Sequence, residues 1–115
     1  LFTGFLRGKD IDRAYKMADL YVMPSVSEPF GITPLESMRN GTPCLISKNS
    51  GVSEVLNHCL KVDFWDIDQM SNKILATLKY GALHKELQSN GYKEVHTFNW
   101  DSPARKCVSV YNSVL

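Results

Sequence analysis

The sequence has few features typical of metalloproteins or disulfide-rich secreted domains. Its three cysteines are odd in number and show no Cys-x-x-Cys spacing, which favours reduced, structural thiols. Its three histidines share no metal-ligand spacing with one another or with the cysteines. We therefore expect no metal site and a cytoplasmic location.

A strong net charge and a long apolar run are also absent. The 13 Lys and Arg residues and 12 Asp and Glu residues give a net charge of +1, which offers no electrostatic basis for binding nucleic acid or an anionic membrane. No apolar run reaches the roughly 18 residues of a membrane span. With 43% hydrophobic residues, the 115 residues are enough for the core of one domain, residues 1–115.

Apolar patterning predicts an alternation of strands and helices. Strands are predicted at residues 1–5, 20–23, 44–47 and 60–62, and the third is apolar enough to be covered on both faces. Helices are predicted at residues 10–18, 34–40, for a short stretch from 50 or 51, and at 67–80, 83–95 and 102–111. This alternation implies an α/β fold with right-handed crossovers and a mostly parallel sheet of about four strands.

Several helix ends have recognisable signals. Asp66 is predicted to cap the helix that follows it, and Gly81 to break that helix. Asn40-Gly41 predicts a left-handed stop for the helix before it. Near the end of the chain, we expect Trp100 and Tyr111 to be packing residues of the terminal helix.

Residues 20–43 form the stretch around which the rest is organised. An apolar strand leads into a loop with Pro and Gly, and the loop leads into a short helix. Thr33 suits the N-cap, Pro34 the first helical position, and Glu36 the third, which would complete a capping box. The helix N-terminus directs a partial positive charge and unpaired N–H groups toward the loop, as α/β proteins do when they bind an anion.

The same stretch resembles a known motif. Glu28-Pro29-Phe30-Gly31 followed by Glu36, with seven residues between the two glutamates, resembles the Glu-x7-Glu motif of retaining glycosyltransferases of the GT-B fold, family 4 (glycosyl transferases group 1) type. Other landmarks in the same order are Phe2-Thr3-Gly4, Tyr21-Val22-Met23-Pro24-Ser25, Leu35-Glu36-Ser37-Met38, Gly41-Thr42-Pro43, Ser50-Gly51-Val52-Ser53-Glu54-Val55 and Phe98-Asn99-Trp100. The resemblance covers nearly the whole chain.

The resemblance implies a partial Rossmann-like, three-layer α/β/α fold. Residues 1–115 would be the latter part of the C-terminal, nucleotide-sugar-binding domain. The first strands of that domain, the basic residues that hold the donor diphosphate, and the acceptor-binding N-terminal domain would lie upstream. A fragment of this kind would leave the strand at residues 1–5 without neighbours. We therefore expect it to pair with residues 20–23, or the chain to form a homodimer through an open sheet edge.

The resemblance also implies a reaction and a site. The reaction is transfer of a sugar, with retained configuration, from a nucleotide-sugar donor to a sugar, lipid-linked or glycan acceptor, without metal or cofactor. Glu28 would be the catalytic residue beside the donor sugar, and Glu36 would bind the ribose hydroxyls. The donor would also be bound by main-chain N–H groups of Phe30, Gly31, Ile32 and Thr33, and its nucleobase by the loop Gly4-Phe5-Leu6-Arg7. The fragment alone is expected to be inactive.

Each assignment has a simpler alternative. Glu36 could complete the capping box or pair with Arg39, and Glu28 could be a solvated loop carboxylate. Residues 4–7 could be a plain strand–helix connection, and Lys48 could reach phosphate or be solvated. The whole chain could instead belong to a nucleotide-sugar epimerase of GT-B-like fold or to a non-catalytic α/β binding module.

One departure from the family pattern concerns the loop after the third predicted strand. Ser50-Gly51 stands where relatives often carry Gly-Gly. If that loop lines the phosphate pocket, we expect Ser50 to reduce the close approach that two glycines allow and to lower donor affinity.

Overall fold

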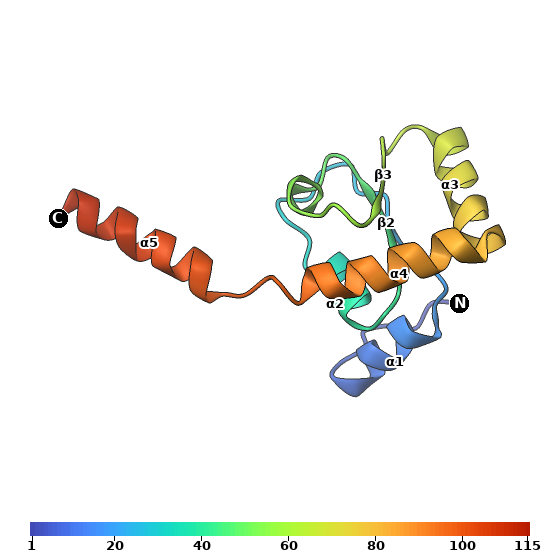
Figure 1. Cartoon of the computed structure of the whole chain (residues 1–115), viewed down its shortest axis with the longest axis horizontal. Coiled ribbons are helices and arrows are strands. Elements are labelled where there is room, and N and C mark those ends of the chain that lie inside the picture. The colour runs from blue at the N-terminus through green and yellow to red at the C-terminus, as the bar shows by residue number, and fades with distance from the viewer.

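A computed structural model describes all 115 residues and shows a small parallel sheet with helices packed around it (Figure 1). The helices are α1 (Lys9–Met17), α2 (Thr33–Arg39), α3 (Ile67–Lys79), α4 (Gly81–Val95) and α5 (Asp101–Val114), with a short 3-10 helix η1 (Gly51–Glu54). The strands are β1 (Tyr21–Met23), β2 (Cys44–Ser47) and β3 (Leu60–Val62). The predicted α/β architecture is confirmed.

The sheet has the order β1-β2-β3, and both pairs of strands are parallel. All four residues of the central strand β2 are buried. Because successive side chains of a strand point to opposite faces, Cys44 and Ile46 join the main core cluster, whereas Leu45 is buried on the other face. The prediction that this strand is covered on both faces is confirmed.

The prediction of a strand at residues 1–5 is wrong, so the sheet has three strands rather than about four. These residues form no ladder with β1, and Leu1, Phe2 and Phe5 are exposed. A strand exists only where a neighbour supplies hydrogen-bond partners, and local β-propensity does not supply one. The predicted pairing with residues 20–23 is therefore also wrong, and the homodimer stays a prediction.

Helix α2 lies at the centre of the packing, in contact with α1, α4, β1 and β2 (Figure 1). The main core cluster joins it to the sheet, to η1 and to α4; its members are Met23, Met38, Cys44, Ile46, Val52, Leu56, Cys59 and Val95. Gly91 allows α4 to approach, because a Cβ there would lie 3.0 Å from Met38 Cε. The core thus contains residues from both sides of the loop that precedes α2, Met23 before it and Met38 after it.

The ends of the helices agree with some signals and not with others. Asp66 caps α3 by accepting the Gln69 N–H at 2.9 Å, and Gly41, with φ of 82°, follows α2, so both predictions are confirmed. The helix that Asp66 caps ends before Gly81, as predicted, but the break lies at Tyr80, and Gly81 is already the first residue of α4.

The predicted capping box at α2 is wrong. Ile32 occupies the N-cap position, the helix begins at Thr33, and no side chain caps it. The Thr33 hydroxyl instead accepts a hydrogen bond from the Tyr21 hydroxyl at 2.8 Å. The Thr33 hydroxyl thus binds the side chain of Tyr21, which is distant in the sequence, instead of a backbone N–H of its own helix.

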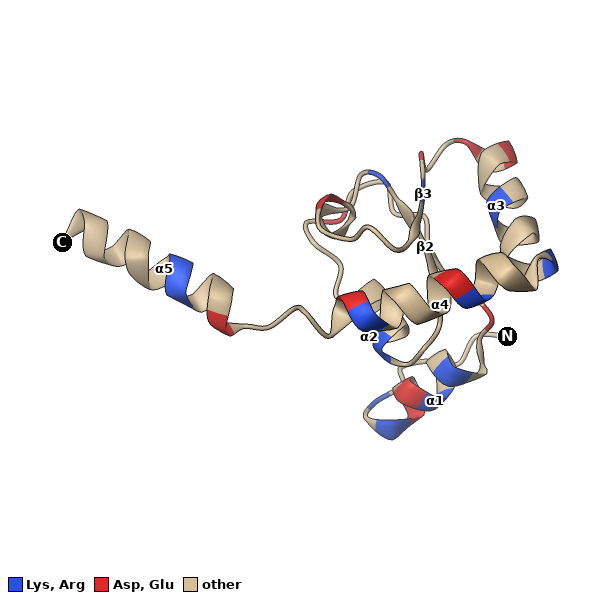
Figure 2. Ribbon diagram, in the orientation of Figure 1, with Lys and Arg blue, Asp and Glu red and all other residues tan.

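Helix α5 projects away from the rest of the chain, and none of its residues is buried (Figure 1). Trp100 is 79% exposed and Tyr111 63% exposed, so the prediction that they pack is wrong. The predicted terminal helix is confirmed, but no other element of the chain lies beside it. No helix is both long and apolar enough to cross a bilayer. Residues of both charge signs occur along the same helices (Figure 2).

Glu94 on α4 anchors the turn before β3. Its carboxylate accepts hydrogen bonds from the N–H groups of Asn57 and His58, both at 2.8 Å, and from the Asn57 side-chain amide at 3.0 Å. Burial alone would raise the pKa of the Glu94 carboxyl, but these bonds outweigh it and hold the pKa below its ordinary value of 4.5.

Replacing Glu94 with Gln should lower the free energy of unfolding by about 1–2 kcal/mol at neutral pH, because three hydrogen-bond donors lose a charged acceptor. A carboxyl with a lowered folded pKa stabilises the fold above its unfolded pKa and loses that effect as pH falls through the folded value. The difference from wild type, measured by urea unfolding, should therefore shrink as the pH is lowered below the ordinary carboxyl pKa of 4.5. The control is Glu86→Gln on the exposed face of α4. An equal effect of both variants would contradict the anchoring role.

Candidate functional site

Two loops meet backbone to backbone beside the carboxyl ends of β1 and β2. The Gly51 N–H donates to the Glu28 carbonyl at 3.0 Å, and the Val52 N–H donates to the Phe30 carbonyl at 2.8 Å. A Cβ on Gly51 would lie 2.1 Å from the Pro29 carbonyl oxygen, a distance that no real side chain adopts. The loop that carries Glu28 therefore keeps this position only because residue 51 has no side chain. We call this contact between residues 28–30 and 50–52 the loop seam.

The Ser50 side chain lies inside its own turn, and the lower donor affinity suggested by the sequence stays a prediction. Its side chain is turned into the fold, where the residue is 2% exposed and its hydroxyl donates to the Ser47 carbonyl at 2.7 Å. A side chain held in this way occupies no space at the surface of the loop. The departure from Gly-Gly is therefore accommodated inside the turn.

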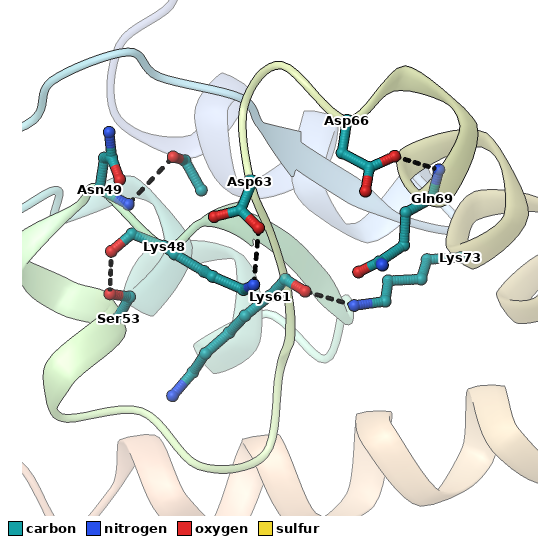
Figure 3. Close-up of polar contacts among 9 residues, drawn as sticks. Lys48, Asn49, Ser53, Lys61, Asp63, Asp66, Gln69 and Lys73 are labelled. Carbon is teal, nitrogen blue, oxygen red and sulfur yellow. Dashed lines mark hydrogen bonds and ion pairs between the residues drawn. The ribbon is translucent and has the colours of Figure 1, made fainter.

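Polar contacts hold the β2–η1 side of the loop seam in place (Figure 3). Lys48 Nζ lies 2.7 Å from Asp63 Oδ2, which joins the segments that follow β2 and β3. The Ser53 hydroxyl donates to the Lys48 carbonyl at 2.9 Å, and the Asn49 amide donates to the Val26 carbonyl at 3.2 Å. Lys48 is thus a paired residue of the scaffold, neither free nor simply solvated.

Glu28 is half-buried, and its side chain contacts its own loop instead of extending into solvent. Its Oε1 lies 3.4 Å from the Phe30 N–H, and a Cβ on Gly31 would lie 3.1 Å from both Glu28 Cγ and Met23 Cε. Gly31 also has a φ of 94°, in the left-handed region that favours glycine. The space that a side chain at residue 31 would need is thus occupied by the side chains of Glu28 and Met23.

The N–H groups at the start of α2 differ in their partners. The Phe30 N–H is taken by Glu28, whereas the N–H groups of Gly31, Ile32 and Thr33 donate to no acceptor in the chain. Three of the four predicted main-chain donors are thus unpaired within the chain. Such groups can bind the oxygens of a ligand.

Glu36 takes neither of the two structural roles considered for it, completion of a capping box or an ion pair with Arg39. Its Oε2 accepts a hydrogen bond from the Tyr15 hydroxyl at 3.3 Å, and there is no capping box. Arg39 pairs with Asp12 at 3.8 Å and not with Glu36. Burial, followed by the Glu36 carboxylate, raises the pKa of the Tyr15 hydroxyl, which keeps it a donor.

Two tyrosines that sequence reasoning did not single out hold the polar side chains of α2. Tyr15 binds Glu36, and Tyr21 binds Thr33. Their rings pack edge to face, with centroids 5.6 Å apart and an interplanar angle of 78°. The available signal was the residue type: a tyrosine on an apolar helix face or in a buried strand needs a partner for its hydroxyl.

A pocket of about 320 Å³ lies along the outer side of α2. Predicted site residues Phe30, Ile32 and Glu36 line it, and the opposite wall comes from residues 95–103. Its other lining residues are Leu35, Arg39, Val95, Phe98, Asn99, Trp100 and Pro103. The Phe98-Asn99-Trp100 landmark therefore faces the same space as one of the two motif glutamates.

The predicted nucleobase loop has no direct polar contact with the two motif glutamates. Gly4, Phe5 and Leu6 make no hydrogen bond or ion pair with Glu28 or Glu36, and the Arg7 guanidinium lies 5.0 Å from the centroid of the Phe5 ring. The nucleobase role of residues 4–7 stays a prediction.

Replacing Gly51 with Ala should lower the free energy of unfolding by at least about 2 kcal/mol, because the new methyl group meets a carbonyl oxygen that cannot move alone. Amide NMR shifts should change most at residues 28–30. Gly81→Ala is the matched control, since a Cβ there meets nothing within 4 Å. Similar stability of the two variants would contradict the loop seam.

Comparison with known sequences identifies relatives of the whole chain. The family model described as glycosyl transferases group 1 matches residues 1–94. An uncharacterised glycosyltransferase of Methanocaldococcus jannaschii is 34% identical over 116 residues, covering 96% of this chain and 30% of that protein. Probable sucrose-phosphate synthase 2 of Craterostigma plantagineum is 32% identical over 103 residues, covering 84% and 10%.

Comparison with solved structures agrees with the sequence comparison. The sucrose-phosphate synthase of Thermosynechococcus elongatus matches with a TM-score of 0.84 and 29% identity, over 99% of this chain and 30% of that one. Anabaena HepE, solved in complex with UDP-glucose, matches with a TM-score of 0.78 and 20% identity, over 96% and 31%, which shows a likeness of fold. This chain spans 30% of the M. jannaschii relative and 10% of the C. plantagineum relative. With its α/β fold, GT-B-like neighbours and a family match over residues 1–94, the chain belongs to the glycosyl transferases group 1 family.

Proposed function

We propose that this chain is the donor-binding part of a retaining glycosyltransferase, and that residues 1–115 are the latter part of a C-terminal nucleotide-sugar-binding domain. One observation carries the proposal. The junction of the β1–α2 loop with α2 carries two half-buried carboxylates, Glu28 and Glu36, and, between them in the chain, three N–H groups that have no acceptor in the chain. Carboxylates accept from hydroxyls, and N–H groups donate to phosphate, so the junction has complementary partners for both parts of a nucleotide-sugar.

In this proposal, the N–H groups of Gly31, Ile32 and Thr33 bind oxygens of the donor diphosphate and sugar. As the sugar leaves, negative charge grows on the diphosphate, and fixed donors stabilise that charge without reorganising. The loop seam keeps the donors fixed, because it pins the carbonyls of Glu28 and Phe30 on the other side of the same loop.

The two glutamates take different parts. Glu36 binds the ribose hydroxyls, and Glu28 orients the donor sugar and balances charge at the reacting centre. Retention then needs no carboxylate nucleophile, since a phosphate oxygen of the leaving group can take the proton of the acceptor hydroxyl. A glycosidase would instead place two carboxylates on either side of the bond that breaks.

The alternatives receive less support. A non-catalytic module would use the glutamates as caps, and neither caps α2. Nothing in the geometry favours an epimerase. We propose that the acceptor, a sugar, lipid-linked or glycan hydroxyl, is bound outside residues 1–115, that these residues alone are inactive, and that the protein works in the cytoplasm.

Ligand-observed NMR of the chain with uridine, guanosine and adenosine diphosphates and their sugar conjugates tests the donor site. UDP-glucose is included because HepE was solved with it. Replacing Glu36 with Ala should weaken binding at least about 10-fold, a loss of about 1.4 kcal/mol, because two ribose hydroxyls lose their acceptor. Glu86→Gln on α4 is the control and should bind as wild type does.

The outcomes separate the parts of the proposal. Saturation transfer to ribose and sugar protons that disappears in Glu36→Ala supports the donor site and names the base. Binding that survives Glu36→Ala contradicts the role of Glu36. Absence of binding by the wild type to every nucleotide contradicts donor binding by this chain.

A further inference from the structure

Helix α1 is fixed against α2 at several points, and Tyr15 lies among them. The Thr42 hydroxyl donates to the Tyr15 carbonyl at 2.6 Å, which ties the backbone of Tyr15 to the segment after α2. Asp12, one turn earlier, accepts from the Asn40 amide at 3.0 Å. The position of Tyr15 relative to α2 is therefore set by contacts at the far end of α2, independent of Glu36.

The ring of Tyr15 is also held. It packs edge to face on Tyr21, whose own hydroxyl is engaged by Thr33. A phenol has only two side-chain torsions, so a fixed backbone and a packed ring leave its hydroxyl little freedom. The donor that reaches Glu36 Oε2 at 3.3 Å therefore comes from a rigid support.

We infer that Tyr15 is a positioning residue for Glu36 and sets the preference of the site for ribose over 2′-deoxyribose. The inference rests on the proposed function, in which Glu36 binds the ribose. It goes further by assigning the sugar discrimination of the nucleotide to a residue of α1 that lies 21 positions earlier in the chain.

The chemistry follows from the shape of the two groups. The terminal torsion of a glutamate is broad, so a free carboxylate can turn its plane to suit one hydroxyl or two. A ribose presents two neighbouring hydroxyls, and a carboxylate binds both well only when both oxygens face them. A hydrogen bond to Oε2 from the α1 side fixes the plane of the carboxylate before the nucleotide arrives. The 2′-hydroxyl then finds an acceptor that is already aimed at it.

The pocket along α2 gives the Glu36 side chain an open side. Glu36 lines that pocket with Phe30 and Ile32, while Tyr15 approaches from α1. Tyr15 does not line that pocket, which agrees with an action on the nucleotide through Glu36. Burial raises the pKa of the Tyr15 hydroxyl, so the hydroxyl stays protonated and can donate to Glu36.

The chain offers a matched control for this inference. Tyr15 and Tyr21 each donate one hydrogen bond to a side chain of α2, and their rings touch. Tyr21→Phe removes a hydroxyl from the same pair without touching Glu36. A general loosening of α2 would follow from either change, whereas a change in sugar discrimination should follow only from Tyr15→Phe.

The experiment measures the dissociation constants of uridine, guanosine and adenosine diphosphates and of their 2′-deoxy counterparts for the wild type, Tyr15→Phe and Tyr21→Phe. For the base that binds, the wild type should prefer ribose about 10-fold, as one well-placed hydrogen bond predicts. Tyr15→Phe should reduce the ratio to about 3-fold or less, chiefly by weakening the ribonucleotide. Tyr21→Phe should leave the ratio unchanged, even if both dissociation constants rise.

Thermal unfolding of the three proteins shows whether the fold is intact. An unchanged ratio in Tyr15→Phe, or equal loss of affinity for both sugars, overturns the inference while the proposed function stands. An equal fall of the ratio in Tyr21→Phe also overturns it. A wild type that binds none of the six nucleotides overturns the proposed function, and this inference with it.

Discussion

The contact between Gly51 and the Pro29 carbonyl is the constraint on which the candidate site depends. With 2.1 Å available where a Cβ would be, the two loops can meet only backbone to backbone. Two main-chain hydrogen bonds then fix the Glu28 loop against the segment after β2. Val52, which follows Gly51, belongs to the buried core, whereas the N–H groups of residues 31–33, which follow the Glu28 loop, have no acceptors in the chain. The rigid side of the loop thus faces the fold, and the unpaired side is free for a ligand.

The same division holds for the side chains of α2. Thr33 and Glu36 are each held by a tyrosine hydroxyl, and the two tyrosines belong to the elements before α2, Tyr15 to α1 and Tyr21 to β1. The ion pair between Lys48 and Asp63 also stabilises the loop seam, because it links the ends of two strands. Polar residues near the site are thus largely satisfied by the scaffold. The groups left unsatisfied are those expected to bind a nucleotide-sugar.

The sequence predicted correctly those helix ends and strands that depend on only a few neighbouring residues. Asp66, Gly41 and the apolar strand at Cys44–Ser47 behave as the sequence predicted, because their effects act within one turn or one strand. The motif glutamates were likewise found on the expected loop and helix. The strand at residues 1–5 failed because strand formation needs a partner that the pattern cannot show. Thr33 failed as a cap because Tyr21, twelve residues away, competes for its hydroxyl. Tyr15 was missed for the same reason, since its partner is known only once the chain has folded.

Native-state amide hydrogen exchange of Gly51 and Val52 tests the central claim most directly. Their N–H groups are the two donors of the loop seam, and neither belongs to the sheet. If the seam fixes the Glu28 loop, both amides should exchange about as slowly as those of β2, because they open only with the core. Exchange as fast as that of the exposed residues 1–5 would mean that the loops separate readily. The unpaired N–H groups of residues 31–33 would then have no fixed position in which to meet a ligand.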